Sequence, residues 1–251
     1  MAAAFGHEKL KVHQKGKNFV AIRKQLLDTI SRRVAACDHL DRGAESILLN
    51  IAHASSSWSP KERIVYLGNA NGSALECAAC LDVFVAKNML TTRDIFLGKS
   101  QLREIVSMLI AMREETSSRI REDHSAYEAT RENSVFSHEN LDVYQIALQF
   151  AGWVEGTCTE FSCSADPRSK LDKSSTSTVL NIAEGNGRFS GTDQAKFLGI
   201  AYKATVQSAS LVDLATADVH STPGRAQEGQ EMLRRIAAML TSLSKFAVES
   251  T

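Results

Sequence analysis

Cys77 and Cys80 are the first candidates for a functional site, because two thiols in a CxxC pattern can bind a metal or exchange a disulfide. A structural zinc site needs four ligands, and the sequence has neither a second CxxC nor a suitably spaced His pair. Redox chemistry needs a strand-to-helix context, whereas alanine and leucine surround this pair. We therefore expect two small core residues and no metal site.

A recurring His–Glu pair is the second candidate. His7-Glu8 returns as His138-Glu139, but neither continues to the HExxH of a metalloprotease, and no repeated Glu-x-x-His pair of the di-iron type occurs. Gly185-Asn186-Gly187 follows a predicted helix rather than a strand, and GxxxxGK[ST] is absent. No nucleophile and base can be paired either. We expect no catalytic residues and no cofactor, hence a protein that is not an enzyme.

The elements that hold these residues occur twice. Shifted by 131 positions, the chain realigns without a gap, and the 120 pairs contain 29 identities. Chance alone gives about 8 for ordinary composition. Leu49-Asn50-Ile51-Ala52, for example, returns as Leu180-Asn181-Ile182-Ala183. The repeat predicts one domain over residues 5–120, a helical or polar linker over 121–135 and a second domain over 136–251.

Each copy has the pattern of four helices. Apolar residues recur at helical spacing over 139–160, and Asp166 with Pro167 indicates the start of a second helix that runs to about Glu184. Ser59 with Glu62 and Thr91 with Asp94 have the spacing of capping boxes. No alternating strand pattern occurs. The fold class predicted is all-α, with two tandem up-down four-helix bundles.

Composition predicts a cytoplasmic protein with no membrane segment. No apolar run approaches the length of a membrane span, the first residues lack a secretory h-region, and the five cysteines form no disulfide framework. The net charge is zero, yet residues 1–131 carry 19 Lys+Arg against 15 Asp+Glu, whereas residues 132–251 carry 10 against 14. The halves therefore have net charges of +4 and −4.

The positive charge is concentrated near the start of the chain. It forms either a solvated helix face or a phosphate-binding face, although a strong nucleic-acid binder is usually more basic overall. The candidates for nucleic-acid binding are Lys9, Lys11, Lys15, Lys17, Arg23, Lys24, Arg32 and Arg33.

Two segments of the second copy resemble a known family. Leu141-Asp142-Val143-Tyr144-Gln145-Ile146-Ala147 and Asn181-Ile182-Ala183-Glu184-Gly185-Asn186-Gly187-Arg188 are similar to the helix-one opening and the helix-two end of the 23S ribosomal RNA intervening-sequence proteins. The first copy keeps Leu49-Asn50-Ile51-Ala52 but has His53-Ala54-Ser55 next, and it keeps Gly72-Ser73 and Glu76 of the third helix. The second copy has Lys203-Ala204 and Gln207 there.

The resemblance implies small helical bundles that assemble into rings, often pentameric. Some members are encoded within inserts of ribosomal RNA genes. A related branch comprises the accessory proteins of diversity-generating retroelements, which bind a reverse transcriptase and its RNA template. Those accessory proteins are strongly basic, whereas this chain is neutral.

Other residues are candidates for structural or partner-binding roles. Asn50 and Asn181 lie among apolar neighbours, so each predicts an amide bonded to the following loop or to another helix. Gly185 and Gly187 are expected to adopt the left-handed conformation that ends a helix. Glu184 and Arg188 form either a local ion pair or part of a partner surface. Trp58 and Phe189, at equivalent positions, are either staples onto their own bundles or anchors for a neighbouring subunit.

We expect a non-catalytic oligomeric scaffold or adaptor, a homo-oligomer that recognises partners through helix surfaces. The alternative is a nucleic-acid-binding accessory protein of a reverse transcriptase or of ribosomal RNA, with RNA or DNA as its ligand.

Overall fold

The computed structural model describes residues 6–30, 34–122, 135–160, 165–217 and 223–249. Over these ranges the chain is helical, with no strand. The first copy contains a 3₁₀ turn η1 (Gly6–Lys9) and helices α1 (Lys11–Asp28), α2 (Ala35–Ser56), α3 (Pro60–Ala86) and α4 (Thr92–Glu122). The second copy contains η2 (Ser137–Asn140), α5 (Asp142–Glu160), α6 (Ala165–Asn186), α7 (Gly191–Ala217) and α8 (Pro223–Glu249).

The internal repeat is visible in the backbone and in its hydrogen bonds. Helices α3 and α7 begin and end at positions 131 apart. The Gln14 side-chain amide donates to the Glu8 carbonyl, and Gln145 donates to the Glu139 carbonyl, both at 2.7 Å. Equivalent residues thus bond the 3₁₀ turn in front of the first helix of each copy to that helix.

Helix boundaries follow the capping chemistry in the first copy. The Ser59 hydroxyl accepts from the Glu62 amide at 3.5 Å, with Pro60 as the first helical residue. The Thr91 amide donates to the Asp94 carboxylate at 2.8 Å, and the Asp94 amide donates back to the Thr91 hydroxyl at 3.3 Å. The predicted capping box therefore forms completely at Thr91 and Asp94, and at Ser59 the hydroxyl caps the helix as predicted. In the second copy α6 begins at Ala165, so Asp166 lies in its first turn rather than capping it.

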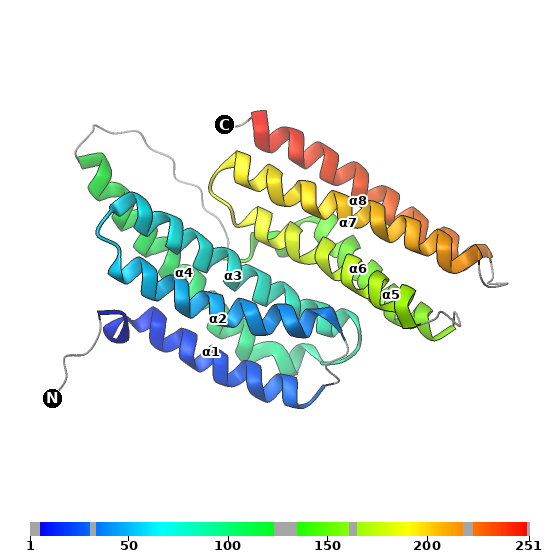
Figure 1. The fold of residues 1–251 in the computed structure, drawn as a ribbon, viewed down its shortest axis with the longest axis horizontal. Helices are drawn as coiled ribbons and strands as arrows, with labels where there is room; N and C mark the ends of the chain where they lie inside the picture. The colour runs from blue at the N-terminus through cyan, green and yellow to red at the C-terminus, as the bar shows by residue number, and fades with distance from the viewer. Residues whose placement is uncertain (1–5, 31–33, 123–134, 161–164, 218–222, 250–251) are drawn as a thin grey trace.

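Each copy is an up-down bundle in which α1 to α4, or α5 to α8, each pack on the next, and the last closes on the first. The predicted fold class, two tandem four-helix bundles, is confirmed. The bundles lie side by side, with α3 and α6 at their junction (Figure 1). The linker predicted over 121–135 falls mostly outside the described residues, which place Arg121 and Glu122 at the end of α4.

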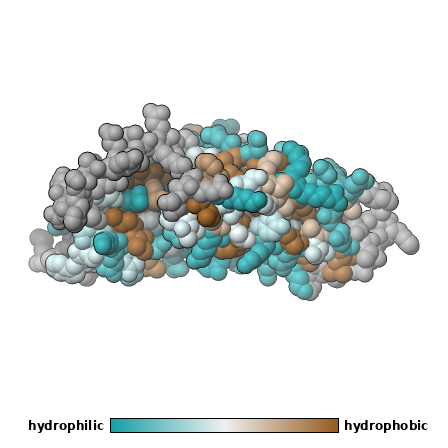
Figure 2. Space-filling view, turned by 90° about the horizontal axis from the view of Figure 1, so that it is seen from above, coloured by the Kyte–Doolittle hydropathy of each residue, from teal (hydrophilic) through white to brown (hydrophobic). Residues whose placement is uncertain are grey.

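The core is continuous from one bundle to the other. Cys77 and Cys80 are buried in it on α3, and burial raises the pKa of both thiols well above its usual value. In the described part of the chain no helix is both long and apolar enough to cross a membrane. On the face seen in Figure 2, apolar patches lie between hydrophilic ones, so part of the outer surface is apolar.

Candidate interaction site between the bundles

The two bundles approach each other closely where α6 ends against α3. A Cβ atom at Gly187 would overlap the Cδ1 atom of Leu75, so a larger residue there would force the Leu75 side chain to move. The Asn71 side-chain amide donates to the Gly187 carbonyl at 3.2 Å, and Asn71 is 3% exposed. The left-handed conformation expected for Gly185 and Gly187 is wrong: no described glycine has a positive φ, and α6 continues to Asn186. Gly187 allows a close approach between helices instead.

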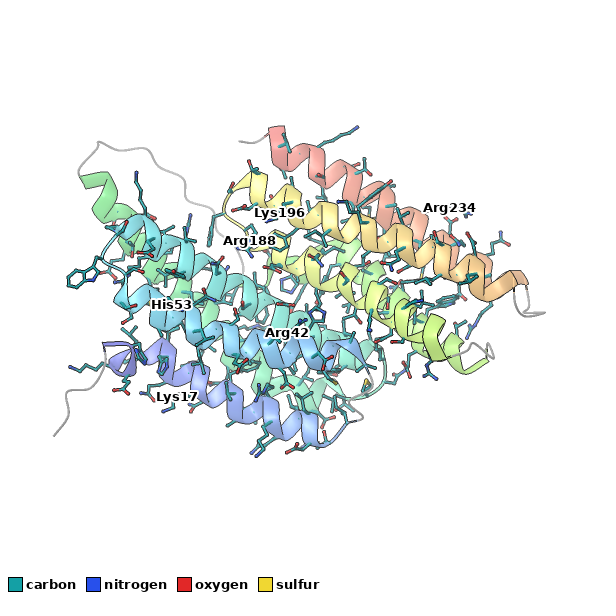
Figure 3. All side chains as sticks on the ribbon, in the orientation of Figure 1. Lys17, Arg42, His53, Arg188, Lys196 and Arg234 are labelled. Carbon is teal, nitrogen blue, oxygen red and sulfur yellow. The ribbon has the colours of Figure 1, made fainter. Side chains whose placement is uncertain are left out.

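Arg188 connects this end of α6 to α3. Its guanidinium pairs with Glu184 one turn earlier and donates to the Asn69 side-chain oxygen at 3.3 Å. It also stacks on the Phe197 ring, 4.3 Å from the centroid. Gly72 leaves room for this pair, because a Cβ there would lie 3.1 Å from the Arg188 Nη2 atom. Figure 3 shows Arg188 at the junction. Glu184 and Arg188 therefore form the predicted local ion pair, and Arg188 also contacts the other bundle of the same chain.

A polar cluster lies further along the junction, where α3 and α4 meet η2 and α5. The Tyr144 hydroxyl donates to Asp82 Oδ2 at 2.8 Å. The Lys99 ammonium lies 2.8 Å from both Asp82 oxygens and 2.6 Å from Glu139 Oε1. Burial raises the pKa of the Asp82 carboxyl, although the bonds from Lys99 and Tyr144 act in the opposite direction. The cluster joins the two bundles by charge-assisted hydrogen bonds.

His138 is the buried member of this region. It is completely buried, and neither ring nitrogen has a hydrogen-bond partner among the described residues. Its ring packs edge-on against Tyr144, with centroids 4.8 Å apart. Burial, helped by the positive charge of Lys99, lowers the His138 pKa to about 3, so the ring is neutral near pH 7.

Asp82, His138 and Glu139 have ligand atoms within 4.8 Å of one another, a spacing that resembles a metal site. The Lys99 ammonium, however, bonds both carboxylates and so occupies the position that a metal ion would take. Beside the cluster, a groove of about 700 Å³ runs along apolar residues such as Ile95 and Phe96. The arrangement therefore favours a protein contact over a metal centre.

A buried ion pair closes the other end of the junction. The Lys87 ammonium, with a fully buried side chain, lies 2.7 Å from Asp172 Oδ1. The second oxygen of Asp172 accepts from the Ala35 amide at 2.7 Å, at the start of α2. Sequence patterns do not single out Lys87, Asp172, Asp82 or Lys99, and they mark Tyr144 only as part of the family-like helix opening. The repeat gives a weak signal for the two aspartates, because Asp82 and Asp172 recur as Asp213 and Asp41.

The predicted structural asparagines form matching bonds in the two copies. Asn50 donates to the Ser46 carbonyl, and Asn181 donates to the Ser177 carbonyl, each at 2.8 Å. Each amide is thus bonded one turn back in its own helix, rather than to the following loop or to another helix. The two asparagines stabilise α2 and α6 and make no described contact across the junction.

Trp58 and Phe189 have different surroundings. Trp58 is 100% exposed, so it is no staple onto its own bundle. The Phe189 ring lies against the other bundle, 3.5 Å below the Arg113 guanidinium carbon of α4. The staple hypothesis is therefore wrong for Trp58, and the contact described for Phe189 joins it to the other copy within one chain.

The predicted basic residues lie along η1 and α1, but they are not equally available. Lys9, Lys11, Lys17 and Lys24 are exposed. Lys15 pairs with Glu104 at 2.6 Å, and Arg23 pairs with Asp41 at 3.2 Å. Arg32 and Arg33 lie outside the described residues.

Fold and site together define an all-α protein of two tandem four-helix bundles joined by one polar, closely packed contact. The family model described as 23S rRNA-intervening sequence protein matches the chain twice, over residues 8–111 and 139–242, and the chain belongs to that family. Comparison with curated proteins and with solved structures gives no match.

Proposed function

We propose that this protein is a non-catalytic oligomeric scaffold or adaptor, which binds partners through the outer faces of its two bundles. The observation that carries the proposal is a difference between equivalent residues. Leu180 on α6 is 2% exposed because α6 lies in the junction, whereas its equivalent Leu49 on α2 is 58% exposed. Leu75 on α3 is 3% exposed, whereas its equivalent Val206 on α7 is 47% exposed.

Each bundle thus carries an apolar face that the other bundle does not cover. The face on the first bundle includes Leu49 and ends at the fully exposed Trp58. The face on the second bundle includes Tyr202 and Val206, which lie one turn apart on α7 and are both more than a third exposed. A partner that covers these exposed apolar side chains would remove them from water, which favours association.

Scaffolding also suits the chemistry of the junction. The charged groups described there are engaged with one another, as in the bonds from Lys99 to Asp82 and Glu139. A general base or nucleophile has to be within reach of a substrate with a proton or lone pair available. The engaged groups instead fix the orientation of one bundle against the other.

The test is the absolute mass of the purified full chain by light scattering, with ultraviolet absorbance to detect nucleic acid. The proposal expects a protein-only species larger than the 27.4 kDa chain. A homogeneous 27.4 kDa species across micromolar concentrations would remove the oligomeric scaffold from consideration.

Nucleic-acid binding, as an accessory protein of a reverse transcriptase or of ribosomal RNA, is the second candidate. The observation in its favour is the row of exposed lysines on η1 and α1: Lys9, Lys11, Lys17 and Lys24. Such a face would neutralise phosphates, and its affinity would fall steeply with salt.

Fluorescence anisotropy with labelled RNA at several salt concentrations tests this candidate. The double variant K11E/K17E should weaken binding and flatten the salt dependence. K196E/K245E, which reverses two exposed charges on α7 and α8, is the matched control and should bind as the wild type does. Binding that K11E/K17E leaves unchanged would reject α1 as the nucleic-acid site.

A further inference from the structure

The contact between the bundles is heterologous, because each copy contributes a different face. The first copy uses α3, α4 and the start of α2, and the second uses η2, α5 and α6. The main equivalents of these faces are α7 with α8 on the second copy, and η1, α1 and the C-terminal part of α2 on the first. A heterologous contact that is made once within a chain leaves one complementary face of each kind open at opposite ends.

We propose that a second copy of this chain binds these open faces head to tail, with its η1–α1–α2 face on the α7–α8 face of the first, in the register of the internal contact. This inference rests on the proposed scaffold function and names its partner and surfaces. Figure 3 places Lys17, on α1, and Arg234, on α8, on opposite outer sides of the molecule, as head-to-tail assembly requires.

Reciprocal changes in size support this register. Leu75 contacts Gly187 within the chain, and the equivalent pair in the open contact is Val206 with Ser56. Valine lacks the Cδ1 atom that would overlap a Cβ at position 187, and serine supplies that Cβ. Val206 is smaller than Leu75, and Ser56 is larger than Gly187. The two differences offset each other, so the packing volume of the pair is similar in both contacts.

A second pair changes in the same way. Within the chain, Gly72 leaves room for the long side chain of Arg188. The equivalent residues of the open contact are Lys203 and Ser57, so the long cationic side chain moves from the end of the second helix to the third helix. Ser57 leaves the space that Lys203 needs.

One ion pair of the internal contact is retained, whereas Lys99 and Lys87 have the equivalents Gln230 and Asp218, which are not cations. Arg103 lies 3.6 Å from Glu139 within the chain, and the open faces present the same pair as Arg234 and Glu8. The Tyr144–Asp82 hydrogen bond would be replaced by a contact between His13 and Asp213, which keeps a donor opposite the carboxylate.

Net charge favours the same assembly. With 19 Lys+Arg against 15 Asp+Glu in residues 1–131, and 10 against 14 in residues 132–251, the halves carry +4 and −4. The first half of one chain is therefore attracted to the second half of another, and like halves repel.

The open contact is not a perfect copy of the internal one. Gly152 lies against the Ala86 backbone carbonyl, where a Cβ would overlap the oxygen, and its equivalent is Ala21. The C-terminal half of α1 must therefore lie farther from α7 than α5 lies from α3. The contact between chains is accordingly looser than the contact within the chain at that end.

Three variants of the full chain test the pairing by light scattering. S56R blocks the open face of the first bundle and V206R blocks that of the second, and both residues are exposed. L97R, which places the same charge on an apolar residue 65% exposed elsewhere on α4, is the matched control. We expect wild type and L97R to form the same oligomer, and S56R and V206R to be 27.4 kDa monomers by themselves.

Mixing the two blocked variants gives the decisive result. S56R keeps an intact α7–α8 face and V206R keeps an intact η1–α1–α2 face, so an equimolar mixture should form a two-chain species that cannot grow. Monomers in the mixture, or blocked variants that keep the wild-type mass, would overturn the head-to-tail pairing while leaving an oligomeric scaffold intact. A monomeric wild type would reject the scaffold and this inference together.

Discussion

Replacing His138 with leucine should remove a specific part of the protein's sensitivity to acid. His138 is buried, and its pKa is lowered from 6.5 to about 3. Between these two values the unfolded chain binds a proton that the folded chain does not bind. The free energy of unfolding therefore falls as the pH falls from about 6.5 towards 3.

The size of this effect follows from the shift. The unfolded imidazole has a pKa of about 6.5, so pH 5 lies about 1.5 pH units below it. Each of these units lowers the free energy of unfolding by about 1.4 kcal/mol. Wild type should therefore lose about 2 kcal/mol through His138 between pH 7 and pH 5. H138L should lack this loss, and at pH 7 it should be at least as stable, because it buries no unpaired ring nitrogen.

Urea denaturation followed by helical circular dichroism at pH 5, 6 and 7 measures the difference. Burial raises the pKa of the Asp82 and Glu184 carboxyls, which acts in the opposite sense with pH, but both variants share those groups. H7L is the matched control at the equivalent position of the first copy, because it leaves His138 in place and should keep the acid sensitivity. If H138L loses as much stability as wild type between pH 7 and pH 5, the buried neutral histidine is not the cause.

Two further predictions concern the junction. G187A should destabilise the protein by about 1–3 kcal/mol because its Cβ overlaps Leu75. The double variant G187A/L75V should recover part of that loss. If the loss came only from a local effect on the helix, G187A and G187A/L75V would be equally destabilised. K87M should lower the free energy of unfolding by about 3–5 kcal/mol because it leaves the Asp172 carboxylate without its cation, and K87M/D172N should be more stable than K87M alone. Urea denaturation of the four variants tests both predictions. A double variant that is no more stable than its single variant would contradict the corresponding prediction.

The helices and their caps could be predicted from local patterns. The capping box of Thr91 and Asp94 forms because its atoms lie within one helical turn, so sequence spacing alone brings them together. The partners of Lys87 could not be predicted in this way, because a lysine near a helix end is usually solvated and Asp172 is 85 residues away. The choice of the faces through which two bundles meet depends on the shape of many residues, and the local spacing of apolar residues does not predict it.

The predictions for single glycines failed for a related reason. A Gly-x-Gly after a helix predicts a left-handed turn, because glycine tolerates that conformation without steric cost. At Gly187 the missing side chain is used instead to admit Leu75 from another helix. In the described part of the chain the residue with a left-handed φ is Asn88, which follows Lys87, the C-cap of α3, and no glycine lies there to predict it. Sequence alone does not distinguish conformational freedom from the need for space.

The division of the family pattern between the copies has a structural explanation. The second copy keeps Glu184 and Arg188 at the end of its second helix, and the first copy keeps Gly72 on its third helix. These residues meet each other in the internal contact, where Gly72 faces the Glu184–Arg188 pair. The equivalents that do not meet within the chain, Ser57 and Lys203 among them, are the ones that have changed. Covalent fusion of the two copies places Gly72 against the Glu184–Arg188 pair in every molecule, so these residues must fit one another, whereas Ser57 and Lys203 are under no such constraint within the chain.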